Sequence, residues 1–312
     1  MIRELENKYK KGESKIEMFE ELFEEEKELH HYKFLLEDEW CKEIVINKET
    51  VYATFNIFGN ELSMHLDNKD LYVVPSQLIN RGFYEKEELE LLIEVLATVP
   101  ANSTFLDIGA NLGWYGINVL KTFPEMSVYS FEAVPFTAKR MKDNFILNGL
   151  DTTKIYNFGL YTENVNKTFY YDIIGSGASS MADLRELPTT KVINVEMKRL
   201  DDCGIKFKNV EFIKCDVEGS ELFVFKGGLK LIEENKPIIF SEMLRKWSAK
   251  FGYTPNDIIN LLKPLGYECY AICGKNKLRY CPIVDDSTIE TNYYFLDTVK
   301  HEKIIKKYSD AI

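Results

Sequence analysis

The 312-residue sequence predicts an α/β protein with a mostly parallel, doubly wound sheet, preceded by an N-terminal helix and a small β extension. Two observations support this prediction. From Ser103 onward, short β-branched or aromatic runs alternate with helical patterns, as in consecutive β–α–β units. The last two apolar runs, 267–273 and 292–296, have no helical pattern between them. We therefore expect them to form an antiparallel pair at one side of the parallel sheet.

The first 80 residues form the predicted N-terminal extension, and residues 81–312 form the predicted main domain. Residues 3–40 carry apolar side chains at helical spacing opposite an acidic face, which predicts an amphipathic helix. Its apolar stripe can pack on its own domain or on a second copy of the chain, so a homodimer contact is one expectation. Short β-branched and aromatic runs within 43–75 predict a small β element. The stretch 81–100 returns to a helical pattern and ends at a proline.

In the alternating part, each apolar run is a predicted strand, and most are followed by a predicted helix. The expected strands are 104–108, 127–133, 154–160, 210–216 and 237–243, with helices near 113–122, 136–148, 220–234 and 255–263. The stretch after the third strand is variable and includes a glycine- and serine-rich loop, 172–181. Two interpretations of this loop are open: its hydroxyls are expected to contact a polar ligand, or it is an ordinary surface connection.

The composition argues against several partners. The formal net charge of -11 disfavours nucleic acid or an anionic membrane as the main partner. No run approaches the roughly 18 consecutive apolar residues of a membrane span. The first residues contain no apolar core of a secretory signal, so the six cysteines are expected to be reduced thiols. We therefore expect a cytoplasmic protein.

A glycine-rich turn follows the first strand of the alternating part. Asp107 ends the strand, and Gly109 and Gly113 open the helix, as in a nucleotide-binding crossover. Glu132 ends the next strand, 19 residues after Gly113, where a carboxylate can accept both hydroxyls of a ribose. Asn111 occupies a position at which a dinucleotide fingerprint has glycine, so its side chain would crowd a pyrophosphate. An amide can instead bind the amino-acid end of S-adenosylmethionine, which favours this cofactor over NAD.

Acidic side chains gather at the ends of two later strands. Asp216 and Glu218 follow the fourth strand, which also carries Lys214, and Glu221 comes soon after them. Glu242 lies near the end of the fifth strand. Ligands of such sheets bind outside the carboxyl ends of the strands, so we expect these side chains beside the glycine turn. Carboxylates there need solvent, a partner or a function, because an unpaired buried charge is costly.

Several motifs resemble those of the FkbM family of S-adenosylmethionine-dependent methyltransferases. They are GFYEKEE (82–88), FLDIGANLGWYG (105–116), FEAVP (131–135), RLDD (199–202), FIKCDVEGSE (212–221) and KPIIFSE (236–242). The pairing of DIGANLG with KCDVEGSE is the most specific part of the resemblance, which spans residues 80–245. It implies a Rossmann-like methyltransferase fold and the methylation of hydroxyl oxygens, often on sugars or secondary metabolites.

The resemblance also implies roles for individual residues. Glu132 takes the ribose, Asp216 lies near the methionine end, and Tyr84 and Glu85 fold over the cofactor. The other residues expected to line the cofactor are Asp107, Gly109, Ala110, Asn111, Gly113, Tyr115, Ala133 and Gly159. The sequence departs from the family at Cys215, where an aliphatic residue is common, and at Ala133, which interrupts an FEP pattern. The second departure concerns the adenine side of the pocket.

Methylation of a hydroxyl needs a base, because the oxygen loses its proton as the new bond forms. None of the four histidines lies at a strand end of the main domain, so we expect a carboxylate base, Glu218 or Glu242. Lys214 is a lesser candidate, for orientation or charge balance, and a divalent metal held by Asp216 and Glu242 is an alternative to a base.

The predicted activity is an S-adenosylmethionine-dependent O-methyltransferase. Its expected acceptor is a saccharide of the bacterial surface polysaccharide type or a related metabolite. The alternatives are an NAD-dependent oxidoreductase or epimerase, and a binding protein without catalysis.

Overall fold

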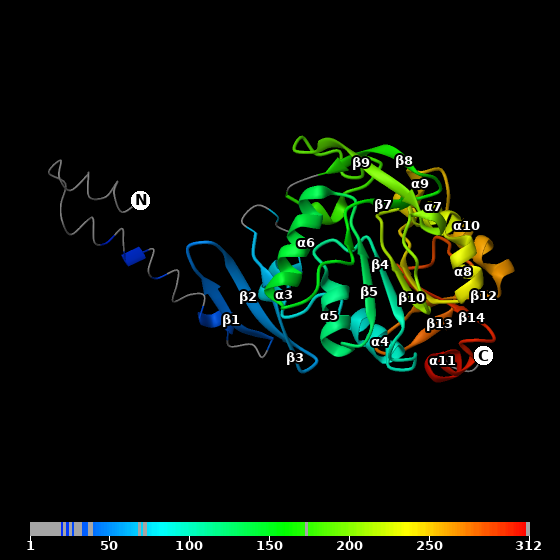
Figure 1. Cartoon of the computed structure of the whole chain (residues 1–312), viewed down its shortest axis with the longest axis horizontal. Coiled ribbons are helices and arrows are strands. Elements are labelled where there is room, and N and C mark those ends of the chain that lie inside the picture. The colour runs from blue at the N-terminus through cyan, green and yellow to red at the C-terminus, as the bar shows by residue number, and fades with distance from the viewer. Residues whose placement is uncertain are drawn as a thin grey trace.

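The computed structural model describes residues 20, 23–24, 27, 33–36, 40–67, 70, 74–171 and 174–309. The predicted amphipathic helix within 3–40, and with it the homodimer contact, falls almost entirely outside these residues. The described chain forms a small N-terminal sheet, a large central sheet with helices on both faces, and a third sheet near the top of Figure 1.

The small sheet confirms the predicted β element. Its antiparallel strands are β1 Cys41–Ile46, β2 Val51–Ile57 and β3 Asn60–His65, and helix α3 Val74–Arg81, which was not predicted, follows them. The backbone N–H groups of Ser63 and His65 donate to the side-chain oxygens of Asn148 and Asn144, at 2.9 and 3.0 Å. Both asparagines belong to the end of helix α6 Pro135–Leu147, so this edge of the sheet is satisfied by the main domain.

The central sheet confirms the predicted fold class. Its strands, from edge to edge, are β13 Leu278–Tyr280, β12 Tyr267–Ile272, β14 Asn292–Asp297, β11 Ile238–Glu242, β10 Val210–Cys215, β4 Thr104–Ile108, β5 Ser127–Phe131 and β6 Ile155–Tyr156. The run from β11 to β6 is parallel, and β14 lies antiparallel between β11 and β12. This is a Rossmann-like methyltransferase sheet with the expected antiparallel pair near its end.

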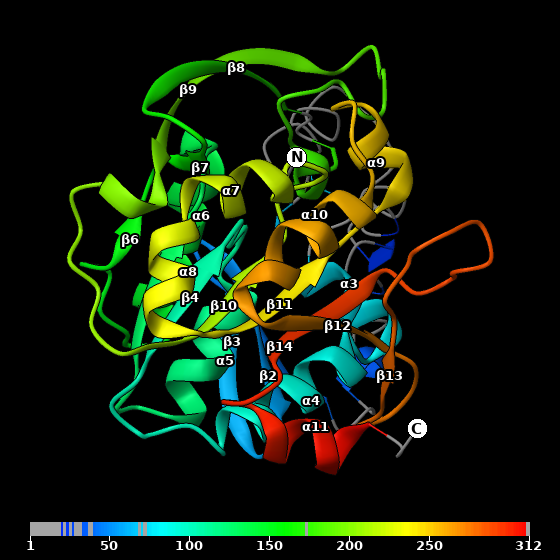
Figure 2. The ribbon, with the colours of Figure 1, turned by 90° about the vertical axis from the view of Figure 1, so that its right-hand side faces the viewer.

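Helices cover both faces of the central sheet (Figure 2). Those of one face are α4 Lys86–Leu96, α5 Trp114–Thr122, α6 and α11 Glu302–Tyr308, and those of the other are α7 Glu221–Gly227, α8 Leu229–Asn235 and α10 Pro255–Leu262. Side chains alternate between the faces along each strand, so Phe105 of β4 joins the first core and Leu106 joins the second. The single helix predicted near 220–234 is divided into the two short helices α7 and α8. A further short helix, α9 Arg245–Ala249, follows β11.

The prediction of one continuous strand over 154–160 is wrong. Asn157 interrupts it, because its side-chain amide donates to the backbone oxygens of Glu132 and Ala133 at 2.9 and 3.1 Å. The chain leaves the central sheet there and continues as β7 Gly159–Tyr161 in a third sheet. The other strands of this sheet, β8 Val165–Tyr171 and β9 Lys191–Arg199, were not predicted, and the order is β7-β9-β8.

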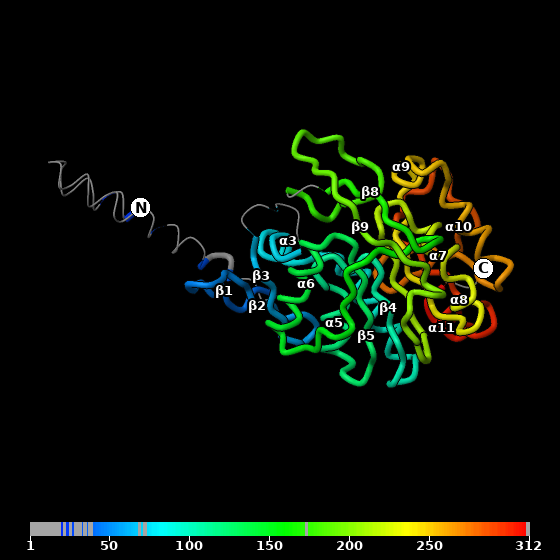
Figure 3. Tube along the Cα trace, turned by 45° about the horizontal axis from the view of Figure 1, so that its top comes forward, coloured from blue at the N-terminus to red at the C-terminus, as the bar shows by residue number. Residues whose placement is uncertain are grey.

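The small sheet lies beside α5 and α6 at one end of the molecule, far from the C-terminal strands (Figures 1 and 3). Phe55, Leu62 and Met64 of the small sheet are fully buried and belong to the same core as Val119 of α5 and Met141 of α6. In the described part of the chain, every helix is too short or too polar to cross a lipid bilayer.

Candidate active site

A cleft that is open to solvent lies at the carboxyl ends of β4, β5 and β10. It is lined by Ile108, Gly109, Asn111, Phe131, Glu132, Ala133, Gly159, Leu160, Phe169, Ser176, Gly177, Ser179, Met197, Asp216, Val217, Glu218 and Ser220. This position, where the winding of an open α/β sheet reverses, is where such sheets bind their ligands. The cleft therefore combines the glycine turn with the first acids after β10, as the sequence predicted.

The glycine turn is shaped by contact between backbones. Gly109 has φ +73°, and a Cβ at this position would lie 1.7 Å from the backbone oxygen of Asp216. The turn after β4 can thus pass directly beside the end of β10 only if residue 109 lacks a side chain. Gly113 meets a different neighbour, since its Cβ would lie 2.6 Å from the Phe145 ring on α6. Gly113 therefore serves the packing of α5 on α6 and does not line the cleft.

Glu132 is held by the turn on both sides of its carboxylate. Its two oxygens accept the backbone N–H groups of Asn111 and Val134 at 3.0 and 2.8 Å. Burial raises the pKa of Glu132 to about 7, although these two hydrogen bonds favour the charged form. Each carboxylate oxygen can accept a further hydrogen bond, so Glu132 can still receive ribose hydroxyls.

Asn111 lines the cleft and has an unused acceptor. The residue has φ +49°, and its side-chain oxygen is buried with no hydrogen-bond partner among the described residues. A buried amide oxygen without a partner is costly, so a ligand donor at this point would be stabilising. The ammonium group of an amino-acid ligand is such a donor. The cleft thus fits a ligand with a ribose near Glu132 and an amino-acid end near Asn111.

Asp107 and Lys214 lie beneath the cleft rather than in it. Asp107 is fully buried and accepts the Gly116 backbone N–H at 3.1 Å. Burial raises its pKa to about 6, with Lys214 acting in the opposite direction. The Lys214 ammonium donates to the backbone oxygen of Gly109 and to Asp216 Oδ2, both at 3.2 Å. Burial lowers the pKa of Lys214, but Asp216 and Asp107 more than offset this and raise it above its usual value, so Lys214 stays charged and balances the acids.

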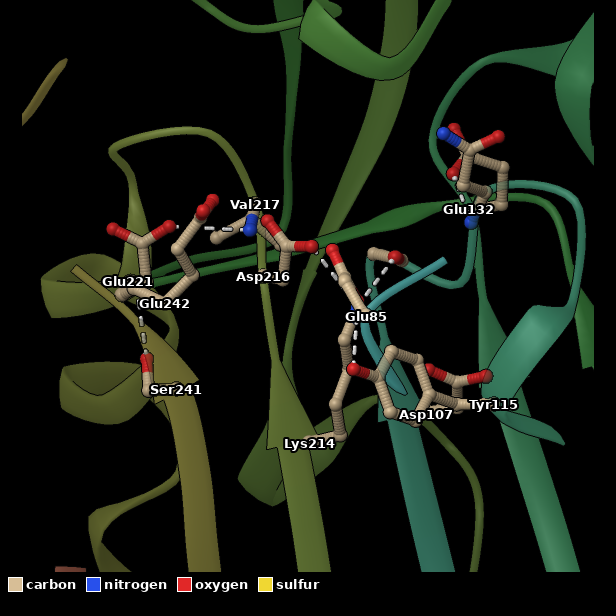
Figure 4. Close-up of polar contacts among 12 residues, drawn as sticks. Glu85, Asp107, Tyr115, Glu132, Lys214, Asp216, Val217, Glu221, Ser241 and Glu242 are labelled. Carbon is tan, nitrogen blue, oxygen red and sulfur yellow. Dashed lines mark hydrogen bonds and ion pairs between the residues drawn. The ribbon is translucent and has the colours of Figure 1, made fainter. Parts of the chain in front are cut away.

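The segment before the main sheet reaches the same network (Figure 4). Glu85, which precedes α4 with φ +44°, accepts the Tyr115 hydroxyl at 2.7 Å. Burial and the neighbouring Asp216 raise the pKa of the Glu85 carboxyl. Tyr84 stands edge-on to Trp114, with ring centroids 6.1 Å apart. The structure therefore places Glu85 beside Asp216, although Tyr84, Glu85, Tyr115 and Ala110 do not line the cleft in the described part of the chain.

Asp216 also belongs to a group of three neighbouring carboxylates, with Glu218 and Glu242, which we call the acid cluster. One oxygen from each of Asp216, Glu218 and Glu242 lies within 4.8 Å of the others. Burial, and then repulsion by Asp216 and Glu218, raises the pKa of Glu242 to about 10, and burial together with Asp216 raises that of Glu218 well above its usual value. The acid cluster therefore retains protons at neutral pH or requires a cation beside it. Glu218 lines the cleft, and Glu242 does not.

The sequence missed several walls of the cleft. Phe169 and Met197 come from the unpredicted strands β8 and β9. The glycine- and serine-rich loop was not missed: ligand contact was one of its two expected roles, and its described part contributes Ser176, Gly177 and Ser179. The β-branched and aromatic runs at 165–171 and 191–199 were the available signal for those strands. From the sequence, Tyr253 could either stack on the face of a sugar or belong to the core; the structure buries its ring and places its hydroxyl 3.1 Å from Glu221 Oε2.

Fold and cleft together define a methyltransferase of the Rossmann-like class. The family model described as "Methyltransferase FkbM domain" matches residues 107–269, and the chain belongs to this family.

Curated relatives are distant. "Methyltransferase sdnD" of Sordaria araneosa is 26% identical over 204 residues, which cover 55% of this chain and 76% of the relative. "2-O-methyltransferase NoeI" of Sinorhizobium fredii is 27% identical over 152 residues, which cover 44% of this chain and 61% of the relative. A solved methyltransferase FkbM from Methylobacillus flagellatus shares 16% identity, with 64% of this chain and 45% of that chain covered and a TM-score of 0.38.

Proposed function

We propose that this methyltransferase uses S-adenosylmethionine and methylates a hydroxyl oxygen of a saccharide or a related metabolite. The observation that carries the cofactor assignment is the unpartnered Asn111 oxygen in a cleft that also presents Glu132. Support for oxygen as the acceptor comes from the hydroxyl methylation that the FkbM resemblance implies and from the name of NoeI, a 2-O-methyltransferase.

The chain offers a separate group for each part of this cofactor. Glu132 would hold the ribose, Ala133 and Gly159 would border the adenine, and Asn111 would accept from the amino group. Asp216, paired with Lys214, lies where the positive charge of the methionine end is favourable. When bound, S-adenosylmethionine supplies an activated methyl group. The protein's task is then to align an acceptor oxygen with it and to exclude water.

We propose that the Glu218 carboxylate is the base that accepts the proton of the acceptor hydroxyl. Among the three candidates for the base, Glu218 is the one that lines the cleft. Lys214 remains charged and hydrogen-bonded, so it has no vacant site for a proton. Glu242 does not line the cleft, and burial together with the neighbouring carboxylates raises the pKa of Glu242 and of Glu218 alike, so position decides between the two. A protonated Glu242 lowers the negative charge around Glu218 and allows Glu218 to ionise for its role as a base.

Calorimetric titration tests the cofactor assignment. The wild-type protein is titrated with S-adenosylhomocysteine and, separately, with NAD(H), and Glu132→Ala is compared with the exposed-site variant Glu196→Ala. We expect the wild-type protein to bind S-adenosylhomocysteine with micromolar affinity. Binding should weaken at least about tenfold in Glu132→Ala, because the ligand loses a charged hydrogen-bond partner, and should be unchanged in Glu196→Ala. Binding of NAD(H) alone would reject the assignment. If neither ligand binds, a binding protein without catalysis would be favoured.

A transfer assay tests the acceptor class. S-adenosylmethionine with a labelled methyl group is incubated with the protein and a panel of neutral and amino-substituted oligosaccharides. Mass spectrometry and alkaline stability of the product then identify the methylated atom. Methyl ethers support the proposal, whereas products methylated only on nitrogen would overturn the assignment of oxygen as the acceptor.

A further inference from the structure

The turn at residues 217–219, which joins β10 to α7, has an unfavourable backbone. Glu218 has φ +53° and Gly219 has φ +91°, so two consecutive residues are left-handed. A Cβ on Gly219 would lie 2.7 Å from Trp247 Cβ, which shows that the turn is pressed against α9. A left-handed conformation is unfavourable for a residue that carries a side chain, such as Glu218. Other contacts must therefore hold this turn, which carries the proposed base.

Two buried side chains hold the turn from the side opposite the cleft. Glu221 Oε1 accepts the backbone N–H groups of Val217 and Gly219 at 3.1 and 3.0 Å. The Tyr253 hydroxyl lies 2.8 Å from the backbone oxygen of Gly219 and 3.1 Å from Glu221 Oε2. Both polar groups of the Gly219 backbone are thus bound by this pair. Figure 4 shows Glu221 among the acids that surround Asp216.

Neither side chain can touch a ligand in the cleft. Glu221 is 2% exposed and Tyr253 is 7% exposed, and neither lines the cleft. The Tyr253 ring packs edge-on to Phe223, with ring centroids 5.8 Å apart, so its position is set by the core. A hydroxyl has one hydrogen, so Tyr253 donates either to Gly219 or to Glu221, and it can accept from a protonated Glu221 in the first case.

We propose that Glu221 and Tyr253 are positioning residues, which hold the 217–219 turn so that the Glu218 carboxylate faces the acceptor hydroxyl. This inference rests on the proposed function. It assigns no contact with cofactor or acceptor to either residue. Their effect passes through the backbone of Val217 and Gly219 to Glu218.

The first test is Tyr253→Phe, with Tyr267→Phe as the matched control. Tyr267 is also a buried tyrosine, and its hydroxyl donates to the backbone oxygen of Pro237 at 2.7 Å. Each variant loses one hydroxyl bound to a backbone carbonyl. We expect kcat of Tyr253→Phe to fall about tenfold, because small misplacements of a reacting group are costly, with KM for S-adenosylmethionine within about twofold of wild type. Tyr267→Phe should leave both constants near wild type.

The second test is hydrogen–deuterium exchange of the peptide that spans residues 216–222. The Val217 and Gly219 amides should exchange faster in Tyr253→Phe than in wild type or Tyr267→Phe. The third is a comparison of Glu221→Gln with Glu221→Ala. A glutamine oxygen can still accept both amides, so Glu221→Gln should recover part of the activity that Glu221→Ala loses.

The outcomes separate this inference from the proposed function. Unchanged exchange in Tyr253→Phe overturns the inference, and so does faster exchange with an unchanged kcat, which would make the pair purely structural. If wild-type protein binds no S-adenosylhomocysteine and transfers no methyl group, the proposed function fails. The exchange measurement then still decides whether Tyr253 holds the turn.

Discussion

Replacement of Gly109 by alanine tests the backbone contact on which the cleft is built. The new methyl group would lie 1.7 Å from the Asp216 backbone oxygen and 2.8 Å from its carbonyl carbon. Neither partner can give way easily, because the Asp216 N–H is itself bonded to the Ile108 oxygen at 3.0 Å. The methyl group must therefore push the ends of β4 and β10 apart or tilt the turn.

The expected loss of stability has two parts. A left-handed backbone costs about 1–2 kcal/mol once a side chain is present, and overpacking adds about 1–3 kcal/mol. The free energy of unfolding should thus fall by about 2–5 kcal/mol. Gly149→Ala is the matched control, since Gly149 has φ +69° but no atom lies within 4 Å of the position that its new methyl group would take. It should lose the first part only.

Thermal unfolding and calorimetric titration measure the two consequences of Gly109→Ala. Its midpoint should lie several degrees below that of Gly149→Ala. Its affinity for S-adenosylhomocysteine should also drop at least about tenfold, because Asn111 and Asp216 follow the ends of the two strands that separate. If Gly109→Ala unfolds at the same temperature as Gly149→Ala and binds as wild type does, the close approach of the two backbones is refuted.

Three further predictions concern the acid cluster. Glu218→Gln should lower kcat by roughly 10²–10⁴-fold, the usual range for a general base, while binding S-adenosylhomocysteine as wild type does; an unchanged kcat would remove Glu218 from the mechanism. Because the folded-state pKa of Glu242 is raised to about 10, its neutral form stabilises the fold at low pH, and this contribution is lost as pH rises from about 4.5 toward 10. The melting temperature of Glu242→Gln should therefore fall less than that of wild type between pH 5 and pH 9, and parallel curves would contradict the shift. Treatment with EDTA should leave the rate of methyl transfer unchanged if carboxylates alone move the proton, whereas a loss restored by Mg²⁺ would assign the acid cluster to a cation.

Much of the central sheet could be predicted because its pattern is local. The strand of Phe105 and Leu106 is short, apolar and closed by a glycine turn, so its end and the helix after it are visible in the sequence. The third sheet gave a weaker signal, because only Phe169 and Tyr171 of β8, and only Val195 and Met197 of β9, are buried. Asn157 ends a strand through contacts with Glu132 and Ala133, which are remote in sequence, and no local pattern reports such contacts.

The candidate site was predictable to the extent that strand ends converge. This rule brought Asn111, Glu132 and Asp216 to one cleft. The rule does not say which side chains at a strand end face the ligand and which support the backbone. Gly113 and Lys214 proved to be supports, because their partners, Phe145 and Gly109, become neighbours only after folding. The position of Glu85 beside Asp216 could not follow from local sequence either, since these residues belong to separate segments of the chain.

The attachment of β3 to α6 bears on how the protein can be shortened. The family match begins at residue 107, which invites a truncated chain without the small sheet. Such a chain would leave the Asn144 and Asn148 side chains without Ser63 and His65, and would open the apolar surface of α5 and α6 to water. The exposed apolar surface of α5 and α6 would then associate with other copies of the truncated chain. Expression of the isolated family segment should therefore give aggregates, and a library of shortened chains is best started upstream of β1.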